Sequence, residues 1–295
     1  MPPIDATVDE FRNFYASCMA AAARQPTWPP GYAWQTRLEG AFEAVPREMF
    51  LPPGPWHIQA VPDGYVETPS ADIRFLYQDV LVAIDKERGI NNGQPSIHAR
   101  FMGQLEPRPG ETVVHIGAGT GYYTAILSVL VTPGGRVSAF ELHEDLAARA
   151  RHNLQTFDNI SITTGDATGL RLPEADVIYV NAGVIRPPLN WLLALRCGGR
   201  MVVPWRPAAD IGIALFIRRT ASGFAVDPAM PAWFIPCVGA SSGSPGDKHP
   251  GLDRAWASRA LYLKAERAPD ATATAIYDEI WFSSERLSHT NPAPH

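Results

Sequence analysis

From about residue 112 the chain alternates short β-rich runs with stretches of helical periodicity, and this alternation constrains the fold more than any other feature. The β-rich runs read TVVHI, RVSAFE, ISITT, DVIYVN, RMVVPW and IGIALFIRR. Helices are predicted between them, over residues 121–131, 143–156 and 187–196. Such alternation requires crossover connections, so we expect a mostly parallel, doubly wound α/β sheet with helices on both faces and ligands at the carboxyl ends of its strands.

Two helices are predicted ahead of this sheet. Thr7 and Glu10 have the spacing of a capping box, and apolar residues follow at helical intervals, which predicts a helix over about 7–24. A second helix is predicted over about 34–45, ending near Pro46 because proline lacks an amide hydrogen.

The segment 51–69 is rich in proline, glycine and aromatic residues and is expected to be an ordered wrapping segment, not a helix. The tail beyond about residue 240 carries no motif that we can assign. We therefore expect an N-terminal helical and substrate-loop region, a Rossmann-like core and a C-terminal extension, over residues 1–95, 96–240 and 241–295.

Composition narrows the possible partners. The chain has 25 Lys+Arg and 30 Asp+Glu, a formal charge of -5 and no basic run, so nucleic acid is not an expected partner. The cysteines, Cys18, Cys197 and Cys237, are odd in number and lack metal or disulfide spacing, so we expect reduced core thiols and no metal site. No window reaches the roughly 20 apolar residues of a membrane span, so we expect a cytoplasmic protein without a membrane partner. The sequence does not predict its oligomeric state.

The string HIGAGTG follows the first strand of the core and precedes a helix. Gly117, Gly119 and Gly121 are explained by a sharp turn whose backbone a ligand can approach closely. A dinucleotide fingerprint needs its third glycine one place later, where this chain has Tyr122. The spacing therefore favours a nucleoside ligand without pyrophosphate, S-adenosylmethionine over NAD.

Two carboxylates follow at later strand ends. Glu141 ends the second strand, where a carboxylate accepts hydrogen bonds from both ribose hydroxyls, and Asp166 follows the third strand, placed to accept from an adenine amino group. Methyltransferases of this fold generally have an acidic residue two places before the first glycine, but this chain has His115, which either reorganises cofactor binding or is a strand-end hydrogen bonder. The predicted cofactor site also includes Ala118, Leu142, Ala167 and Asn181.

In this order, the motifs resemble those of the protein-L-isoaspartate O-methyltransferase family. AFEAVPREMFLP resembles its N-terminal signature, and YQDV resembles its tyrosine and aspartate ahead of the substrate loop. GQPSIHARFM resembles the segment leading into its first strand, HIGAGTGYYTA resembles its cofactor turn, and LRCGGRMVVPW and FIPCVGA resemble its later strands. The resemblance covers about residues 10–240. It implies a class I S-adenosylmethionine-dependent methyltransferase fold, S-adenosylmethionine as methyl donor, and matching cofactor positions at Gly117, Ala118, Gly119, Gly121, Glu141 and Asp166.

The loop GINNGQPS departs from that family's pattern. In the family this loop carries a Thr-Ile-Ser run whose serine helps to hold the isoaspartyl carboxylate, whereas this chain reads Asn-Asn-Gly. Ser96 either replaces that serine or, as we favour, caps the following helix. Side-chain amides and the glycine backbone can still cradle a carboxylate. We therefore expect an acceptor loop with a wall behind it, made by Asn91, Asn92, Gly93, Tyr77 and Asp79.

Other acceptors and functions stay open. A hydroxyl acceptor requires a general base, for which His57, His98 and His115 are candidates, although a structural role is expected for each. Methylation of a base would predict an Asn-Pro-Pro-aromatic motif where this chain reads VNAGV, and Tyr122 disfavours a nicotinamide oxidoreductase. The favoured function is an O-methyltransferase acting on a carboxylate of a peptide or protein. The alternatives are a methyltransferase acting on a small-molecule acceptor, such as a small acid, and a regulatory protein that binds the cofactor without methyl transfer.

Overall fold

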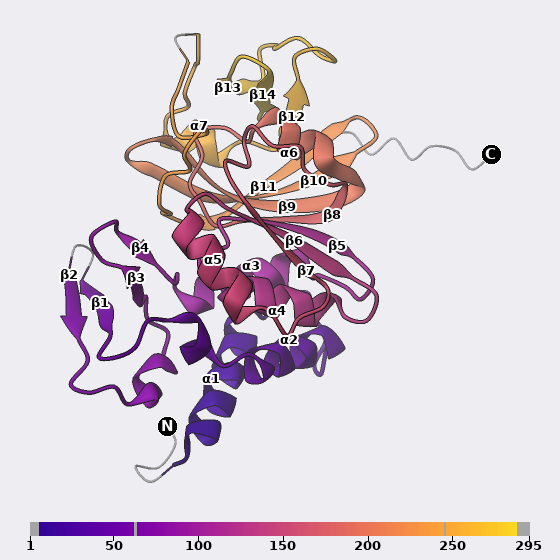
Figure 1. Cartoon of the computed structure of the whole chain (residues 1–295). Coiled ribbons are helices and arrows are strands. Elements are labelled where there is room, and N and C mark those ends of the chain that lie inside the picture. Colours follow the sequence, from indigo (N-terminus) through magenta and orange to yellow (C-terminus); the bar gives the residue numbers. More distant parts are fainter. Residues whose placement is uncertain (1–5, 62–63, 245, 288–295) are drawn as a thin grey trace. The chain divides into compact units, whose positions relative to one another are not determined.

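The computed structural model describes residues 6–61, 64–244 and 246–287. Contacts between Cα atoms divide the chain into two compact units, Met1–Gly165 and Asp166–His295. The first unit contains the helices and hairpins of the N-terminal region and three strands of the core, and the second contains the remaining strands (Figure 1). The division into three regions that we expect from the sequence stays a prediction.

The first unit begins with the two predicted helices, α1 (Val8–Ala22) and α2 (Ala33–Ala44). The capping box is present, because Thr7 Oγ1 accepts a hydrogen bond from the Glu10 amide at 3.3 Å and Glu10 Oε2 accepts one from the Thr7 amide at 2.7 Å. The helix α2 ends just before Val45 and Pro46, as predicted.

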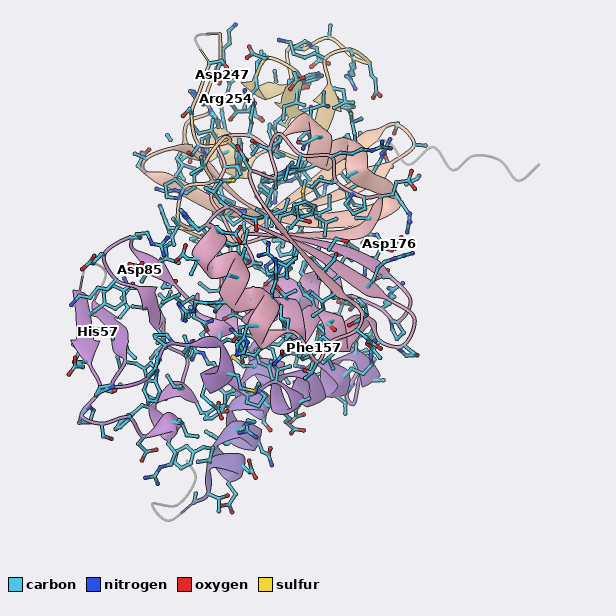
Figure 2. The ribbon with its side chains drawn as sticks, viewed as in Figure 1. His57, Asp85, Phe157, Asp176, Asp247 and Arg254 are labelled. Carbon is cyan, nitrogen blue, oxygen red and sulfur yellow. The ribbon has the colours of Figure 1, made fainter. Side chains whose placement is uncertain are left out.

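Short elements follow α2, and the predicted wrapping segment contains an antiparallel hairpin. A second hairpin lies beside it, joined by a bridge between Ile58 and Val82, and Figure 2 labels His57 on the first hairpin and Asp85 on the second. These strands were not predicted because they are short and lie in irregular sequence. The elements are η1 (Arg47–Phe50), β1 (His57–Val61), β2 (Gly64–Glu67), η2 (Ile73–Leu76), β3 (Ala83–Asp85) and β4 (Ile90–Asn91).

Three parallel strands form the core of the first unit, β5 (Thr112–Ile116), β6 (Arg136–Glu141) and β7 (Ile160–Thr164). Their register aligns Ile116 with Phe140 and Glu141 with Thr164, so the carboxyl ends of the strands lie together. Helix α3 (Pro95–Leu105) precedes β5 in the chain, α4 (Tyr122–Val131) follows it, and α5 (Glu144–Asn153) follows β6 (Figure 1). The α4 and α5 helices contact the sheet directly.

The second unit is dominated by antiparallel pairing. Its strands lie in the order β13-β14-β12-β11-β10-β9-β8, and among the strand pairs that the structure describes in this unit β8 and β9 are parallel and the others antiparallel. The expectation of a mostly parallel sheet is therefore wrong for this unit, because tight turns instead of crossover helices connect β9 to β10 and β10 to β11. Its elements are β8 (Ala175–Val180), α6 (Leu189–Ala194), β9 (Leu195–Ala208), β10 (Ile211–Thr220), β11 (Gly223–Pro231), α7 (Leu252–Trp256), β12 (Ala260–Leu263), β13 (Ala273–Ile276) and β14 (Ile280–Ser283).

The cysteines are free, as predicted, but only Cys237 is a core thiol, while Cys18 and Cys197 are exposed. The tail beyond residue 240 contributes Tyr277 and Trp281 to the core of the second unit, where both are buried. Within the described ranges no helix is long and apolar enough to cross a membrane, and no group of three or more metal-ligating side chains gathers.

Candidate functional site

The glycine turn is attached to the end of β6 by backbone hydrogen bonds. The amides of Gly117 and Ala118 both donate to the carbonyl oxygen of Phe140, at 2.9 and 3.1 Å. The amide of Gly121 then donates to the Ala118 carbonyl at 2.9 Å, which closes the turn before α4 begins at Tyr122. The turn therefore has one fixed conformation relative to Glu141, the last residue of β6.

Gly119 and Gly121 serve the turn in different ways. Both have positive φ, 56° and 99°, in the region that favours glycine. A Cβ at Gly121 would lie 2.7 Å from Leu154 Cδ1, so the Leu154 side chain would have to shift to admit it. A Cβ at Gly119 would meet only Ile84 Cδ1, at 3.9 Å. Of these two glycines, Gly119 is thus the one with open space beside its Cα.

Glu141 is buried and holds the turn from the β6 side. Its Oε2 accepts a hydrogen bond from the Gly119 amide at 2.7 Å, and its Oε1 accepts one from the His143 amide at 3.0 Å. Two carboxylate oxygens have about four acceptor positions, so capacity remains for the two hydroxyls of a ribose. The neighbouring Leu142 is 36% exposed, which offers an apolar surface beside the carboxylate. These residues fit the nucleoside part of S-adenosylmethionine.

Each of the three histidines considered as a general base makes contacts that are consistent with the structural role expected for it. His115 is fully buried, its Nδ1 lies 2.8 Å from Thr124 Oγ1, and burial lowers its pKa to about 3. His98 stacks on Tyr123 with ring centroids 3.7 Å apart, and burial, followed by the charges of His115 and Arg47, lowers its pKa well below the usual value. His57 lies on β1 and has Nε2 3.7 Å from a carboxylate oxygen of Glu67.

The predicted acceptor loop is an ordered turn. Asn91 Oδ1 accepts a hydrogen bond from the Gly93 amide at 2.9 Å, and the Asn92 amide donates to the Val82 carbonyl at 2.8 Å. Gly93 has φ 74°, and a Cβ there would lie 2.2 Å from His98 Nε2. The backbone amide of Gly93 is therefore already used within the loop, and of the two asparagines Asn91 is half-buried and Asn92 is buried.

Arg47 organises this loop and was not among the predicted site residues. Its guanidinium is completely buried, and Nε donates to Asn92 Oδ1 at 3.1 Å. The other nitrogens donate to three backbone carbonyls, at Leu76, Gln78 and Val80. Arg47 lies within the AFEAVPREMFLP motif, but a sequence alone does not tell a buried arginine from a solvated one.

The η1 helix links the acceptor loop to the glycine turn. Arg47, at its start, holds Asn92, and the carbonyl of Phe50, at its end, accepts a hydrogen bond from Thr120 Oγ1 at 2.5 Å. Thr120 is buried and lies between the two glycines Gly119 and Gly121. One turn of helix therefore holds both the predicted acceptor loop and the glycine turn in place.

Asp79 and Tyr77 have different partners. Asp79 Oδ1 accepts a hydrogen bond from the Ser96 amide at 2.8 Å, and Oδ2 accepts one from Gln94 Nε2 at 2.9 Å. The carboxylate thus caps α3, and the prediction that Ser96 is the cap is wrong, because Ser96 lies inside the helix.

The Tyr77 hydroxyl accepts a hydrogen bond from Arg12 Nε at 2.8 Å and donates one to Glu48 at 2.5 Å, and burial raises the pKa of Tyr77.

The remaining predicted cofactor residues belong to the second unit. Asp166 Oδ1 accepts a hydrogen bond from the Thr168 amide at 2.9 Å. The carbonyl of Ala167 accepts two side-chain hydrogen bonds, from Asn190 at 2.9 Å and from Trp191 at 3.0 Å. Asn181 directly follows β8 and is half-buried. These contacts shape the turn after residue 165, and the roles of these residues toward a cofactor stay predictions.

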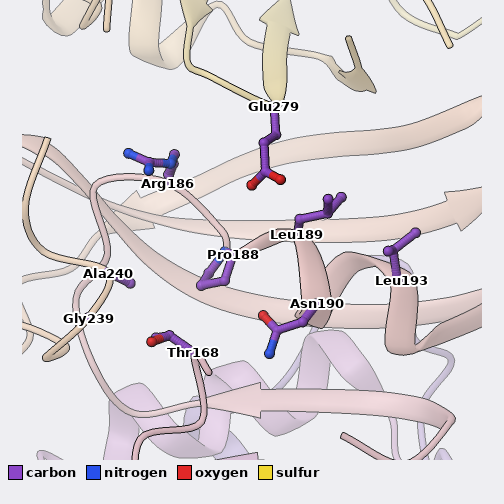
Figure 3. A pocket seen from close by; sticks show the side chains of 9 residues that line it. All are labelled: Thr168, Arg186, Pro188, Leu189, Asn190, Leu193, Gly239, Ala240 and Glu279. Atoms are coloured by element: carbon purple, nitrogen blue, oxygen red, sulfur yellow. The ribbon is translucent and has the colours of Figure 1, made fainter. Parts of the chain in front are cut away.

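A pocket of about 430 Å³ opens beside that turn in the second unit (Figure 3). Its polar groups include Arg186, which is 3.3 Å from Asp247 Oδ2, and the carboxylate of Glu279. None of the residues predicted from the sequence lines it. The lining residues are Thr168, Arg186, Pro188, Leu189, Asn190, Leu193, Gly239, Ala240 and Glu279.

A family model and individual relatives match this chain under the same description. A family model described as protein-L-isoaspartate(D-aspartate) O-methyltransferase matches residues 29–242. A protein-L-isoaspartate O-methyltransferase of Ignicoccus hospitalis is 29% identical over 212 residues, covering 70% of this chain and 92% of the relative. One of Aeropyrum pernix is 31% identical over 219 residues, covering 71% of this chain and 75% of the relative.

Solved structures show the same fold. A protein-L-isoaspartate O-methyltransferase superposes with a TM-score of 0.62 at 21% identity, covering 92% of this chain and 86% of its own. A Plasmodium falciparum protein of that description, in complex with S-adenosyl-L-homocysteine, has a TM-score of 0.58 at 16% identity, covering 77% and 97%. The likeness supports the expected Rossmann-like α/β fold.

Proposed function

The chain belongs to the protein-L-isoaspartate(D-aspartate) O-methyltransferase family, and from this premise we propose that it methylates the carboxylate of isoaspartyl residues in proteins and peptides. Its methyl donor is S-adenosylmethionine, and its fold is that of class I methyltransferases. The observation that carries the proposal is the link made by η1, which fixes the glycine turn and the asparagine loop within one unit.

S-adenosylmethionine supplies a methyl group bound to a sulfonium, which is electrophilic without further activation. In our proposal the Gly119 backbone and Glu141 hold its nucleoside part, with Leu142 as an apolar neighbour. His115 contacts α4 through the hydrogen bond between its Nδ1 and Thr124 Oγ1. It does not carry a charge at neutral pH, because burial lowers its pKa. Asp166, Ala167 and Asn181 are proposed cofactor contacts on the basis of their positions in the sequence.

An ionised carboxylate is a nucleophile, so methyl transfer to it needs no general base. The chain's contribution is to align the acceptor and to exclude water. This agrees with the buried, uncharged state of His98 and His115, neither of which is needed to take a proton. A hydroxyl acceptor, in contrast, would require a base near the methyl group.

We assign the acceptor carboxylate to the side-chain amino groups of Asn91 and Asn92. The oxygen of each amide is occupied, in Asn91 by the Gly93 amide and in Asn92 by Arg47, so each amide has a defined orientation. Two amide N–H donors can bind the two oxygens of one carboxylate. Asp79 fixes α3 directly behind this loop, and Tyr77 positions the preceding segment against α1 through Arg12.

The proposal is tested by incubating the protein with S-adenosylmethionine and an isoaspartyl peptide, beside the ordinary aspartyl peptide of the same sequence. Mass spectrometry should detect the gain of one methyl on the isoaspartyl peptide alone. Cofactor binding without methylation of either peptide would refute the proposed acceptor. Methylation of both peptides equally would show that the loop recognises a carboxylate without recognising the isoaspartyl linkage.

A further inference from the structure

The β3–β4 hairpin runs directly into the acceptor loop, since β4 ends at Asn91. At its start, Ile84 on β3 is the neighbour nearest to the open side of Gly119, with Cδ1 3.9 Å from the position that a Cβ of Gly119 would take. One short hairpin therefore passes next to the cofactor turn and then supplies the residues proposed to bind the acceptor.

The turn of this hairpin is anchored by Arg88. The Arg88 amide donates to Asp85 Oδ1 at 3.0 Å and its Nε donates to Asp85 Oδ2 at 2.7 Å, which closes the turn on itself. The two terminal nitrogens then reach Asp145, at 3.1 Å to Oδ1 and 2.5 Å to Oδ2. Both oxygens of Asp145 are thus held in a two-pronged contact, the most specific arrangement open to an arginine and a carboxylate.

Asp145 is close in the chain to the residues that hold the glycine turn. Asp145 lies in the first turn of α5, and the segment before it contains Glu141 and His143, which are hydrogen-bonded to each other. The hydrogen bonds with Arg88 lower the pKa of Asp145, so the carboxylate stays ionised and paired at neutral pH. Arg88 therefore connects the hairpin to the first turn of α5, which directly follows the segment containing Glu141, the residue bonded to the Gly119 amide.

We propose that Arg88 is a positioning residue for the methyl transfer. Its ion pair with Asp145 holds the β3–β4 hairpin against the cofactor turn, and the hairpin in turn holds the acceptor loop in the position required for methyl transfer. The inference rests on the proposed function for its catalytic consequence. The anchoring itself depends only on contacts within the first unit. The pair is exposed, with 37% and 58% of the two side chains accessible, so both residues can be replaced without opening the core.

The test uses the variants Arg88→Gln, Asp145→Asn and the double variant. The matched control is Arg151→Gln, which removes another exposed ion pair of α5, the one with Glu144 at 3.1 Å, without touching the hairpin. Hydrogen exchange is followed at the amides of residues 91–93 in the protein without cofactor. Methylation of an isoaspartyl peptide is then measured with cofactor and peptide both saturating.

Each single variant should speed exchange at 91–93 and lower kcat by about two- to fivefold, the range expected for an exposed but well-aligned pair. The double variant should match the single variants, because both residues act through one contact. The inference would be overturned if both single variants left the exchange rates at 91–93 unchanged. It would also be overturned if the effects of the two substitutions on kcat added in the double variant, or if Arg151→Gln changed exchange and kcat as much as Arg88→Gln does. If even the unmodified protein methylates nothing, the proposed function fails, and the exchange data still decide the role of Arg88.

Discussion

Arg47 Nε donates a hydrogen bond to Asn92 Oδ1 at 3.1 Å, and this contact determines which way the asparagine amide faces. A guanidinium has only donors, so the amide oxygen must lie toward Arg47 and the amino group on the other side. Because Arg47 is completely buried and also donates to backbone carbonyls, the orientation is part of the folded structure. The Asn92 amino group therefore faces away from Arg47, the orientation that the proposed contact with an acceptor requires.

Replacing Glu141 with alanine should weaken S-adenosylmethionine binding by one to two orders of magnitude, because about 1.5–3 kcal/mol of charge-assisted hydrogen bonding is lost. Titration calorimetry measures this directly. The control is Glu144→Ala, which removes an exposed carboxylate of the same segment and should leave the affinity unchanged. An unchanged affinity in Glu141→Ala would remove Glu141 from the cofactor site.

Alanine substitutions at Gly119 and Gly121 should have different effects, the first mainly on cofactor affinity and the second mainly on the free energy of unfolding. At Gly121 the new Cβ meets Leu154 at 2.7 Å and φ is 99°, so the free energy of unfolding should fall by about 2 kcal/mol or more. At Gly119 the space is open, so only the strain of positive φ, about 1 kcal/mol, is expected, together with a loss of cofactor affinity. Urea unfolding and calorimetry on both variants test this. Normal cofactor binding by Gly119→Ala would contradict the assigned approach of the ligand.

Removing the Asp79 carboxylate should destabilise α3. Asp79→Ala loses the hydrogen bond to the Ser96 amide, and a lost helix cap costs about 1 kcal/mol of unfolding free energy. Ser96→Ala is the matched control, because its hydroxyl makes only a weak 3.4 Å contact with Gln94 and does not cap the helix. Methylation should also fall in Asp79→Ala, since the acceptor loop directly precedes α3. Equal unfolding free energies for the two variants would refute the capping role.

Acid should destabilise the protein partly through His115. Burial lowers its pKa to about 3, whereas a histidine in the unfolded chain has a pKa of about 6.5. Between these values only the unfolded chain binds the proton, so the stabilising effect of the neutral buried side chain is present above pH 6.5 and is lost as the pH falls. The loss is about 2 kcal/mol at pH 5. Urea unfolding at pH 7, 6 and 5 should therefore show a shallower decline for His115→Gln than for the unmodified protein, and parallel declines would exclude this role.

The sequence predicted the regular parts of the first unit well. Thr7 and Glu10 form the expected capping box, and the strand that ends at Glu141 has the predicted bounds. These predictions depend on local signals, namely side-chain spacing, turn residues and apolar runs, which a single sequence contains. The hydrogen bond from the Gly119 amide to Glu141 was not predicted, although both residues were expected at the same end of the sheet.

What the sequence did not predict depends on long-range packing. Arg47 is 45 residues from Asn92, and no local pattern tells which side chain will fill the space behind the loop. Arg88 and Asp145 are 57 residues apart and meet only because a short hairpin folds back toward α5. Ser96 was expected to cap α3, but Asp79, 17 residues earlier, reaches the same amide. Contacts of this kind become visible only once the backbone is in place.

The assignment of Asn92 is tested most directly by the kcat/KM for an isoaspartyl peptide in Asn92→Ala, measured at saturating S-adenosylmethionine, with cofactor affinity determined in the same preparation. The kcat/KM should fall by about tenfold or more, as expected from losing one hydrogen bond to a charged acceptor, with cofactor affinity unchanged. A kcat/KM equal to that of the unmodified protein would contradict the assignment of the asparagine loop as the acceptor site.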